Sequence, residues 1–298
     1  MKAISSALAP RSPAPRILLR SSWQTVNIGD IGHTPGILRL LEQYLPEAKV
    51  TLWPGNIDGS VRQMLARHFP RVEMVDGDTD AAGQPIQAEL RAAFATHDFL
   101  LHGSGPSVVA QNHLDAWRRI TGKPYGIFGV TIDPVTAPEG KASEGGTLVQ
   151  LRQQIERLPA DHLDPLLRSV LTGAAFILCR DSLSLGYLRS QRIPNQLLGF
   201  ASDAAFGIAI RDDALASEFL RAHRLEARKF ICLIPRTRYT PYHLVHGTAP
   251  TTEDLRRQMI SDRHLEADLA KMAEVVERWV TETAHRVLVC PEMTYQVD

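Results

Sequence analysis

Residues that could bind an anion or move a proton are concentrated in TVNIGDIGHTPG, residues 25–36. Glycines at 29 and 32 permit close backbone approach, and Asp30 could cap a helix whose first N–H groups would face an anion. His33 is a candidate acid–base group because of its place in this loop. A capped strand-to-helix turn that binds nothing explains the same residues, so both interpretations stay open.

A second glycine-containing turn, HGSGPS at 102–107, carries Gly103, Gly105 and a second candidate acid–base residue, His102. Val108 stands where the dinucleotide-binding pattern needs a third glycine, and the sequence contains no phosphate-binding GK[ST] motif. We therefore expect no nucleotide cofactor.

The segment CRDSLS, 179–184, places Arg180 at the end of an apolar run and Asp181 or Ser182 at the start of the next helix. A guanidinium beside a helix N-terminus suits a small anion with carboxylate and phosphate groups. A surface Arg–Asp pair beside a helix cap is the alternative.

Arg236 and Arg238 follow a later apolar run, in IPRTRYTPYHLVHG, and could face the same cleft from the other side. His243 and His246 have the spacing of metal ligands, but no third ligand stands near them, so we expect no metal site.

Short apolar runs alternate with segments of helical period, which is typical of a parallel sheet with crossover helices. In such a sheet, ligands bind at the carboxyl ends of the strands, where the four segments above lie. The runs that we expect to be strands are RILLRSS from 16, KVTLWP from 49, VEMVDG from 72, DFLLHG from 98, PYGIFGV from 124 and AFILCRD from 175. Helices are expected from 35, 61, 113 and 163.

The pattern restarts after about residue 210. FICLIPR from 230 and RVLVCPE from 286 are expected strands, with a long helix from Asp262 to about Thr283 between them. We expect a disordered tail over 1–15, a Rossmann-like domain over 16–210 and the start of a second, truncated Rossmann-like domain over 211–298.

Composition narrows the class of partner. Lys plus Arg and Asp plus Glu are equal at 33 each, which gives no electrostatic basis for binding nucleic acid. No run approaches the roughly 20 apolar residues of a membrane span. The three cysteines lie far apart in apolar runs, which indicates buried thiols, a reducing compartment and a cytoplasmic location.

Taken in order, the segments resemble the polysaccharide pyruvyl transferase family. The likeness covers nearly the whole chain, and the Gly-Asp of the first loop and the Arg-Asp-x-x-Ser of the middle are its most specific parts. The matching segments are NIGD (27–30), DFLLHGSG (98–105), KPYGIFGV (123–130), CRDSLSLGYL (179–188), SDAAF (202–206), FICLIPR (230–236) and VLVCPE (287–292).

The resemblance implies two Rossmann-like domains that face each other as in GT-B glycosyltransferases. It implies a pyruvyl transferase that moves the pyruvyl group of phosphoenolpyruvate onto sugar hydroxyls of a polysaccharide or glycan precursor as a ketal, without a cofactor. The substrate-binding positions carried over from it are Asn27, Gly29, Asp30, Gly103, Gly105, Arg180, Asp181 and Ser184. The family's second domain continues beyond the position of Asp298, hence the expected truncation.

Two other functions fit the same architecture. One is a GT-B-type glycosyltransferase that uses a nucleotide sugar, and the other is a non-catalytic protein that binds glycan in the cleft.

Overall fold

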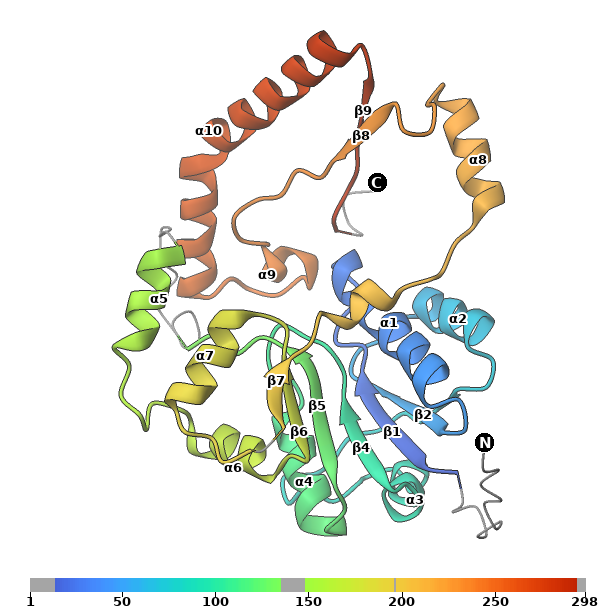
Figure 1. The fold of residues 1–298 in the computed structure, drawn as a ribbon, viewed down its shortest axis with the longest axis vertical. Coiled ribbons are helices and arrows are strands. Elements are labelled where there is room, and N and C mark those ends of the chain that lie inside the picture. The colour runs from blue at the N-terminus through green and yellow to red at the C-terminus, as the bar shows by residue number, and fades with distance from the viewer. Residues whose placement is uncertain (1–13, 135–147, 196, 294–298) are drawn as a thin grey trace, which may run out of the picture.

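The computed structural model describes residues 14–134, 148–195 and 197–293. Its main feature is a seven-stranded parallel sheet with the order β3-β2-β1-β4-β5-β6-β7, the doubly wound Rossmann-like arrangement (Figure 1). The strands are β1 (Arg16–Ser21), β2 (Lys49–Pro54), β3 (Glu73–Met74), β4 (Phe99–His102), β5 (Tyr125–Val130), β6 (Phe176–Cys179) and β7 (Leu198–Phe200). The α/β class expected from the sequence is confirmed.

Helices cover both faces of this sheet, because successive side chains of a strand point to opposite faces. In β1, Leu18 packs into one apolar core while Ile17 and Leu19 pack into the other. The first core lies under α3 (Ala88–Thr96), α4 (Gln111–Thr121), α5 (Leu148–Glu156), α6 (Pro165–Gly173) and α7 (Ser182–Ser190). The second lies under α1 (Ile28–Tyr44) and α2 (Gly59–His68).

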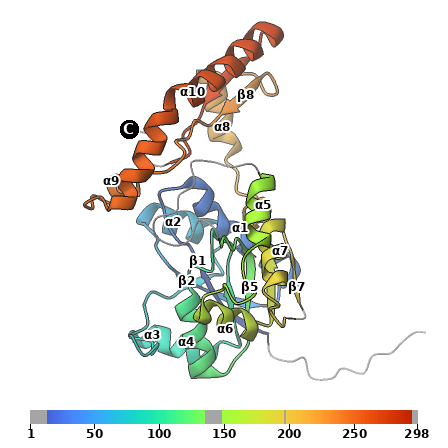
Figure 2. The ribbon, with the colours of Figure 1, turned by 90° about the vertical axis from the view of Figure 1, so that its left-hand side faces the viewer.

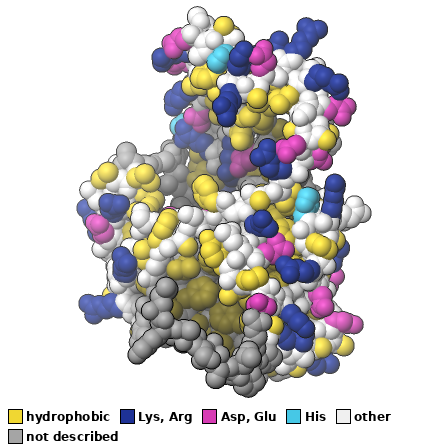
Figure 3. Space-filling model, turned by 45° about the vertical axis from the view of Figure 1, so that its right-hand side comes forward, with side chains coloured by type: hydrophobic (Ala, Val, Ile, Leu, Met, Phe, Trp, Pro, Cys, Tyr) yellow, Lys and Arg dark blue, Asp and Glu magenta, His cyan; other side chains and the backbone are white. Residues whose placement is uncertain are grey.

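One part of the second face has no helix over it among the described residues. Figure 1 shows β4, β5 and β6 uncovered beside α1, and Figure 3 shows hydrophobic side chains gathered around a hollow in the lower half of the molecule. The hollow is lined by apolar side chains alone, among them Phe99, Phe128 and Phe176.

A smaller unit stands above the carboxyl edge of the large sheet (Figures 1 and 2). It contains the parallel pair β8 (Phe230–Leu233) and β9 (Arg286–Val289), with α8 (Asp213–Ala222), α9 (Tyr242–Val245) and α10 (Thr252–Thr283). A short 3-10 helix, η1 (Ala204–Gly207), follows β7 and packs on α1. Two Rossmann-like units that meet across a carboxyl edge form a GT-B-like arrangement.

Helix α1 differs from the expectation in both its start and its cap. It begins at Ile28 instead of near Pro35, so Gly29, Asp30 and His33 occupy its first two turns. The cap is Asn27, whose Oδ1 accepts from Gly29 N at 2.7 Å, and not Asp30. Pro35 lies inside the helix, a position that a sequence pattern normally argues against because proline removes a backbone donor.

The start of α10 also differs from the expectation. Helix α10 begins at Thr252, ten residues before the expected start at 262, and a capping box between Thr251 and Asp254 fixes that beginning. The tail predicted over 1–15 lies outside the described residues except for Ala14 and Pro15.

Of the three cysteines, Cys179 is buried as expected, but Cys232 is exposed and Cys290 is half-buried. Along the described ranges, none of the helices is both long and apolar enough to cross a membrane.

Candidate active site

The functional side chains gather at the carboxyl edge of the large sheet. His33 and Asp30 come from the start of α1, Thr131 follows β5, Arg180 follows β6 and Asp203 follows β7. The parallel topology places all these positions along one edge of the sheet, because the carboxyl ends of parallel strands lie on the same side. We call Asp30, His33, Arg180 and Asp203 the edge cluster.

His33 is the centre of the edge cluster. Its side chain is only 5 % exposed, with Nε2 3.2 Å from Asp203 Oδ2 and Nδ1 3.5 Å from Asp30 Oδ1. Nη1 of Arg180 lies 3.4 Å from the same Nε2. A ring protonated at Nε2 can donate to Asp203, and a ring that lacks this proton can accept from Arg180. His33 therefore has a partner at Nε2 in either protonation state, which suits a group that gives and takes a proton.

Glycines bring Asp203 to this histidine. A Cβ on Gly36 would lie 1.9 Å from Ala204 O, so only glycine lets η1 pack this closely on α1. The hydroxyl of Ser104 accepts from Ala204 N at 2.9 Å and fixes the start of η1 from the other side. Asp203 itself caps η1 by accepting from Ala205 N. The sequence HTPG of the first segment thus serves the contact between α1 and η1.

Arg180 points into the edge cluster rather than away from it. Its Nε donates to Thr131 Oγ1 at 2.8 Å, and Nη1 forms an ion pair with Asp203. Arg180 thus lies at the end of its strand with its guanidinium directed to His33 and Asp203. Its guanidinium, however, is shared with a carboxylate of this chain, which the sequence did not indicate.

The two carboxyl groups of the edge cluster differ in acidity. Burial raises the pKa of Asp30, although His33 and the Gln24 amide oppose that shift. Burial would also raise the pKa of Asp203, but hydrogen bonds from His33, from the Ala205 amide and from Arg180 outweigh it and lower that pKa to about 2. Neighbouring groups whose pKa values are shifted in opposite directions are characteristic of acid–base sites.

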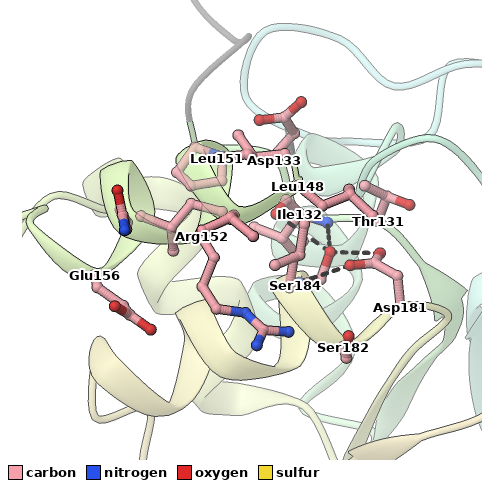
Figure 4. Close-up of a pocket in the computed structure, with 15 residues that line it drawn as sticks. Thr131, Ile132, Asp133, Leu148, Leu151, Arg152, Glu156, Asp181, Ser182 and Ser184 are labelled. Atoms are coloured by element: carbon pink, nitrogen blue, oxygen red, sulfur yellow. Dashed lines mark hydrogen bonds between the residues drawn. The ribbon is translucent and has the colours of Figure 1, made fainter. Parts of the chain in front are cut away.

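Asp181 and Ser184 hold the loops beside the edge cluster. Asp181 caps α7 by accepting from Ser184 N at 2.7 Å, and Ser184 Oγ accepts from Ile132 N at 2.8 Å. They also line a pocket of about 710 Å³ between α5 and α7, which Figure 4 shows with Arg152 and Thr131 at its walls. Ser184 is buried, so its contacts in the structure are to the protein itself.

The second glycine turn is packed against the protein's own side chains. A Cβ on Gly103 would lie 2.7 Å from Ser21 Oγ, and one on Gly105 would lie 2.8 Å from Trp23 Nε1. Trp23 fills this turn, because its ring stacks on His102 and its Nε1 donates to Ser104 O at 2.6 Å. These contacts account for both glycines without a ligand.

His102 lies in the core, with 0 % of its surface exposed. Its Nδ1 is 2.7 Å from Gly103 O, and its Nε2 accepts from Ala110 N at 3.3 Å. Burial lowers the pKa of His102 to about 3. The His102 ring has no access to solvent, and both of its nitrogens are hydrogen-bonded, so it cannot reach a substrate. Of the two candidate histidines we therefore retain only His33.

In the described part of the chain, the smaller unit contacts the first loop and its neighbour Gln24 at Glu292 and at Tyr242. Glu292 O accepts from Ile28 N at 3.1 Å, and the Glu292 carboxylate is 3.0 Å from Arg236 and 3.4 Å from Asn27 Nδ2. Gln24 Nε2 donates to Tyr242 Oη at 3.3 Å. The tips of the two units therefore converge where the sequence placed the cleft.

The two candidate arginines of the smaller unit are both paired with acids. Arg236 contacts Glu292, and Arg238 makes a two-point contact with Asp268 at 2.8 and 3.1 Å that raises its pKa. Arg238 therefore faces α10, away from the edge cluster, while Arg236 lies beside Asn27.

No family model and no curated protein sequence matches this chain. Solved structures with a partly similar shape do exist. One is a UGT transferase from Siraitia grosvenorii in complex with UDP, at 10 % identity and a TM-score of 0.37, in which the match covers 77 % of this chain and 60 % of that one. Another is UDP-GlcNAc 2-epimerase from Neisseria meningitidis bound to UDP-GlcNAc, at 10 % identity and a TM-score of 0.44, covering 93 % and 72 %. A third is a 2,6-sialyltransferase from Photobacterium sp. JT-ISH-224, at 12 % identity and a TM-score of 0.42. That match covers 77 % of this chain and 52 % of the sialyltransferase chain. Likenesses of this size do not assign a function.

Four residues of the site are not among those singled out from the sequence: Thr131, Asp203, Gln24 and Tyr242. Asp203 stands in the SDAAF segment, so an acid directly after an apolar run was a signal that could have found it. Gln24 and Tyr242 are uncharged side chains to which the sequence gives no role. Gln24 contacts Asp30 within the large unit, and Tyr242 reaches Gln24 from the smaller unit. Within the described chain, His, Cys, Asp and Glu form no group of three or more that could hold a metal ion.

Proposed function

We propose that this chain is a transferase that moves the pyruvyl group of phosphoenolpyruvate onto sugar hydroxyls. The observation that carries the proposal is His33, which has a partner at Nε2 in both protonation states and lies beside Arg180 where the two units converge. The order of the sequence segments that resemble pyruvyl transferases supports the choice of donor.

The reaction needs a proton donor, a base and a cation. A general acid protonates the methylene carbon of the enol phosphate, and a sugar hydroxyl attacks the adjacent carbon, which has become electron-poor. Phosphate leaves, and a second hydroxyl closes the ketal. We assign the proton transfers to His33, with Asp203 and Asp30 holding its ring.

Arg180 is the cation nearest to His33 and the residue that we assign to the donor. Its described contacts use Nε and Nη1, and its side chain is 25 % exposed. A guanidinium offers five N–H donors in a fixed fork, so one edge can hold Asp203 while Nη2 meets a carboxylate or phosphate oxygen.

A glycosyltransferase that uses a nucleotide sugar is the second candidate. It is favoured by one observation: Arg180, Arg236 and Arg238 are each paired with an acid of this chain, which reduces the cationic charge available to a doubly anionic three-carbon donor. A histidine held by carboxylates would then serve as the base that activates the acceptor hydroxyl.

Calorimetric titration and phosphate release separate the two functions. Phosphoenolpyruvate should bind, and Arg180→Ala should weaken that binding at least tenfold, about 1.4 kcal/mol. Arg211→Ala is the matched control, because Arg211 is 77 % exposed in the smaller unit and pairs only with Asp213 among the described residues. With a panel of sugars as acceptors, the protein should release phosphate from the donor.

The opposite result would support the glycosyltransferase that uses a nucleotide sugar. A nucleoside diphosphate that raises the melting temperature, together with no heat and no phosphate from phosphoenolpyruvate, would overturn pyruvyl transfer.

A further inference from the structure

We propose that Tyr242 is a positioning residue of this site, which acts on His33 through Gln24 and Asp30. The inference rests on the proposed function only for the catalytic role of His33. The chain of contacts that carries it runs from the smaller unit to the centre of the edge cluster.

Gln24 joins the two ends of this chain. Its Nε2 donates to a carboxylate oxygen of Asp30 and to the Tyr242 hydroxyl at 3.3 Å. A carboxamide nitrogen has two hydrogens, so each partner can receive its own. Oε1 of Gln24 is buried and has no hydrogen-bond partner among the described residues. The two donated bonds are thus the polar contacts that hold this amide in place.

Asp30 transmits the position of Gln24 to His33. One carboxylate oxygen takes the bond from Gln24, and the other lies 3.5 Å from His33 Nδ1. That nitrogen is buried and, within the described chain, hydrogen-bonds to no atom. A small movement of Asp30 therefore decides whether Nδ1 has an acceptor, and with it which ring nitrogen keeps the proton.

Tyr242 supplies the anchor from the smaller unit. It is the first residue of α9, and its ring stacks on His246 with the ring centres 5.9 Å apart. The other link between the units, through Glu292, ends on Asn27 and Ile28 and so holds the start of α1, whereas Tyr242 is joined to the Asp30 side chain through Gln24. Docking of Tyr242 is the contact through which the smaller unit sets the acceptor at Nδ1.

A double-substitution cycle tests this chain of contacts. The variants are Tyr242→Phe, which removes only the hydroxyl, Gln24→Leu, and both together, with Tyr44→Phe as the matched control because Tyr44 is 70 % exposed on α1. Tyr242→Phe should lower kcat about tenfold with KM within about twofold, and the double variant should be no slower than Gln24→Leu, since both act through one amide.

A second readout does not depend on the reaction. At fixed pH, the ¹⁵N resonance of His33 Nδ1, assigned with a His33→Asn variant, should move in Tyr242→Phe and in Gln24→Leu and stay in place in Tyr44→Phe. Melting curves identify any variant that has lost its fold. If either Tyr242→Phe or Gln24→Leu has done so, the Nδ1 resonance of the other variant is the test.

Two results would overturn the inference. One is an unchanged Nδ1 resonance in Tyr242→Phe, and the other is a double variant whose loss of kcat equals the product of the two single losses. If the wild type transfers no pyruvyl group, the proposed function fails, and the resonance alone still decides whether Tyr242 acts on His33.

Discussion

His33 Nε2 and Asp203 Oδ2 lie 3.2 Å apart, although His33 follows β1 and Asp203 follows β7, with β4, β5 and β6 between those strands in the sheet. The sheet alone cannot bring them together. The packing of η1 on α1 through Gly36 does so, because it carries the chain after β7 back across the carboxyl edge. The site therefore depends on this contact as much as on the residues themselves.

Replacing His33 should remove the proton transfer and leave the fold intact. We expect His33→Asn to lower kcat for phosphate release by at least about 100-fold, the range of positioned acid–base catalysis. KM for the donor should change less than kcat, because His33 is assigned to the transition state rather than to binding. Steady-state kinetics with phosphoenolpyruvate and an active acceptor provide the measurement.

His68→Asn is the matched control for that variant, since His68 is an exposed residue at the end of α2. It should retain wild-type kinetics. Equal losses in both variants, or a full rate in His33→Asn, would remove His33 from the mechanism.

Asp203 should make the free energy of unfolding depend on pH. Its pKa falls from 3.8 to about 2 on folding, so the unfolded chain takes up a proton first as the pH decreases. The resulting stabilisation, about 2 kcal/mol, is present above pH 4 and is lost as the pH falls towards 2. Asp203→Asn should unfold more easily at pH 7, by about 3 kcal/mol, because it leaves Arg180 without its acid.

Urea unfolding at several pH values checks both parts of this prediction. The free energy of unfolding of the wild type should decline more steeply between pH 4 and pH 3 than that of Asp203→Asn. Parallel curves would show that Asp203 is not the group that titrates.

His102 should behave as a buried neutral residue. Its pKa falls from 6.5 to about 3 on folding, so the unfolded chain binds the proton first as the pH drops below 6.5, and the wild type loses stability there. His102→Gln should destabilise the protein by about 2 kcal/mol at pH 7, and this difference should shrink as the pH falls from 6.5 to 4. A constant difference across that range, measured by chemical unfolding, would contradict the assignment.

The sequence predicted the large sheet well because its strands, apart from the short β3 and β7, are mainly apolar runs. Periodicity also placed the site at the carboxyl ends of these strands, where Arg180 and His33 are found. These features are local in the sequence or follow from the parallel topology, so a single sequence is enough to predict them.

The sequence was less informative where contacts between distant segments determine the structure. Gly103 and Gly105 suggested room for a ligand, but Ser21 and Trp23 pack against them, and nothing near 103 in the sequence indicates this. The start of α1 was placed too late because Pro35 suggested a helix beginning. Asn27 caps the helix earlier, and the missing N–H of Pro35 is tolerated inside it.

The contact between α1 and η1 can be tested directly with one methyl group. Gly36→Ala would place a Cβ 1.9 Å from Ala204 O, so η1 must shift and carry Asp203 away from His33. We expect a loss of about 3 kcal/mol of stability, the upper part of the range for overpacking, together with a lower kcat in the molecules that remain folded. Gly186→Ala is the control, because Gly186 lies inside α7 and a Cβ there meets nothing within 4 Å. That variant should gain about 0.5 kcal/mol, as alanine is the better helix former, and keep its kcat. Similar melting temperatures and rates for the two variants would mean that η1 adjusts freely and that the distance between His33 and Asp203 is not set by Gly36.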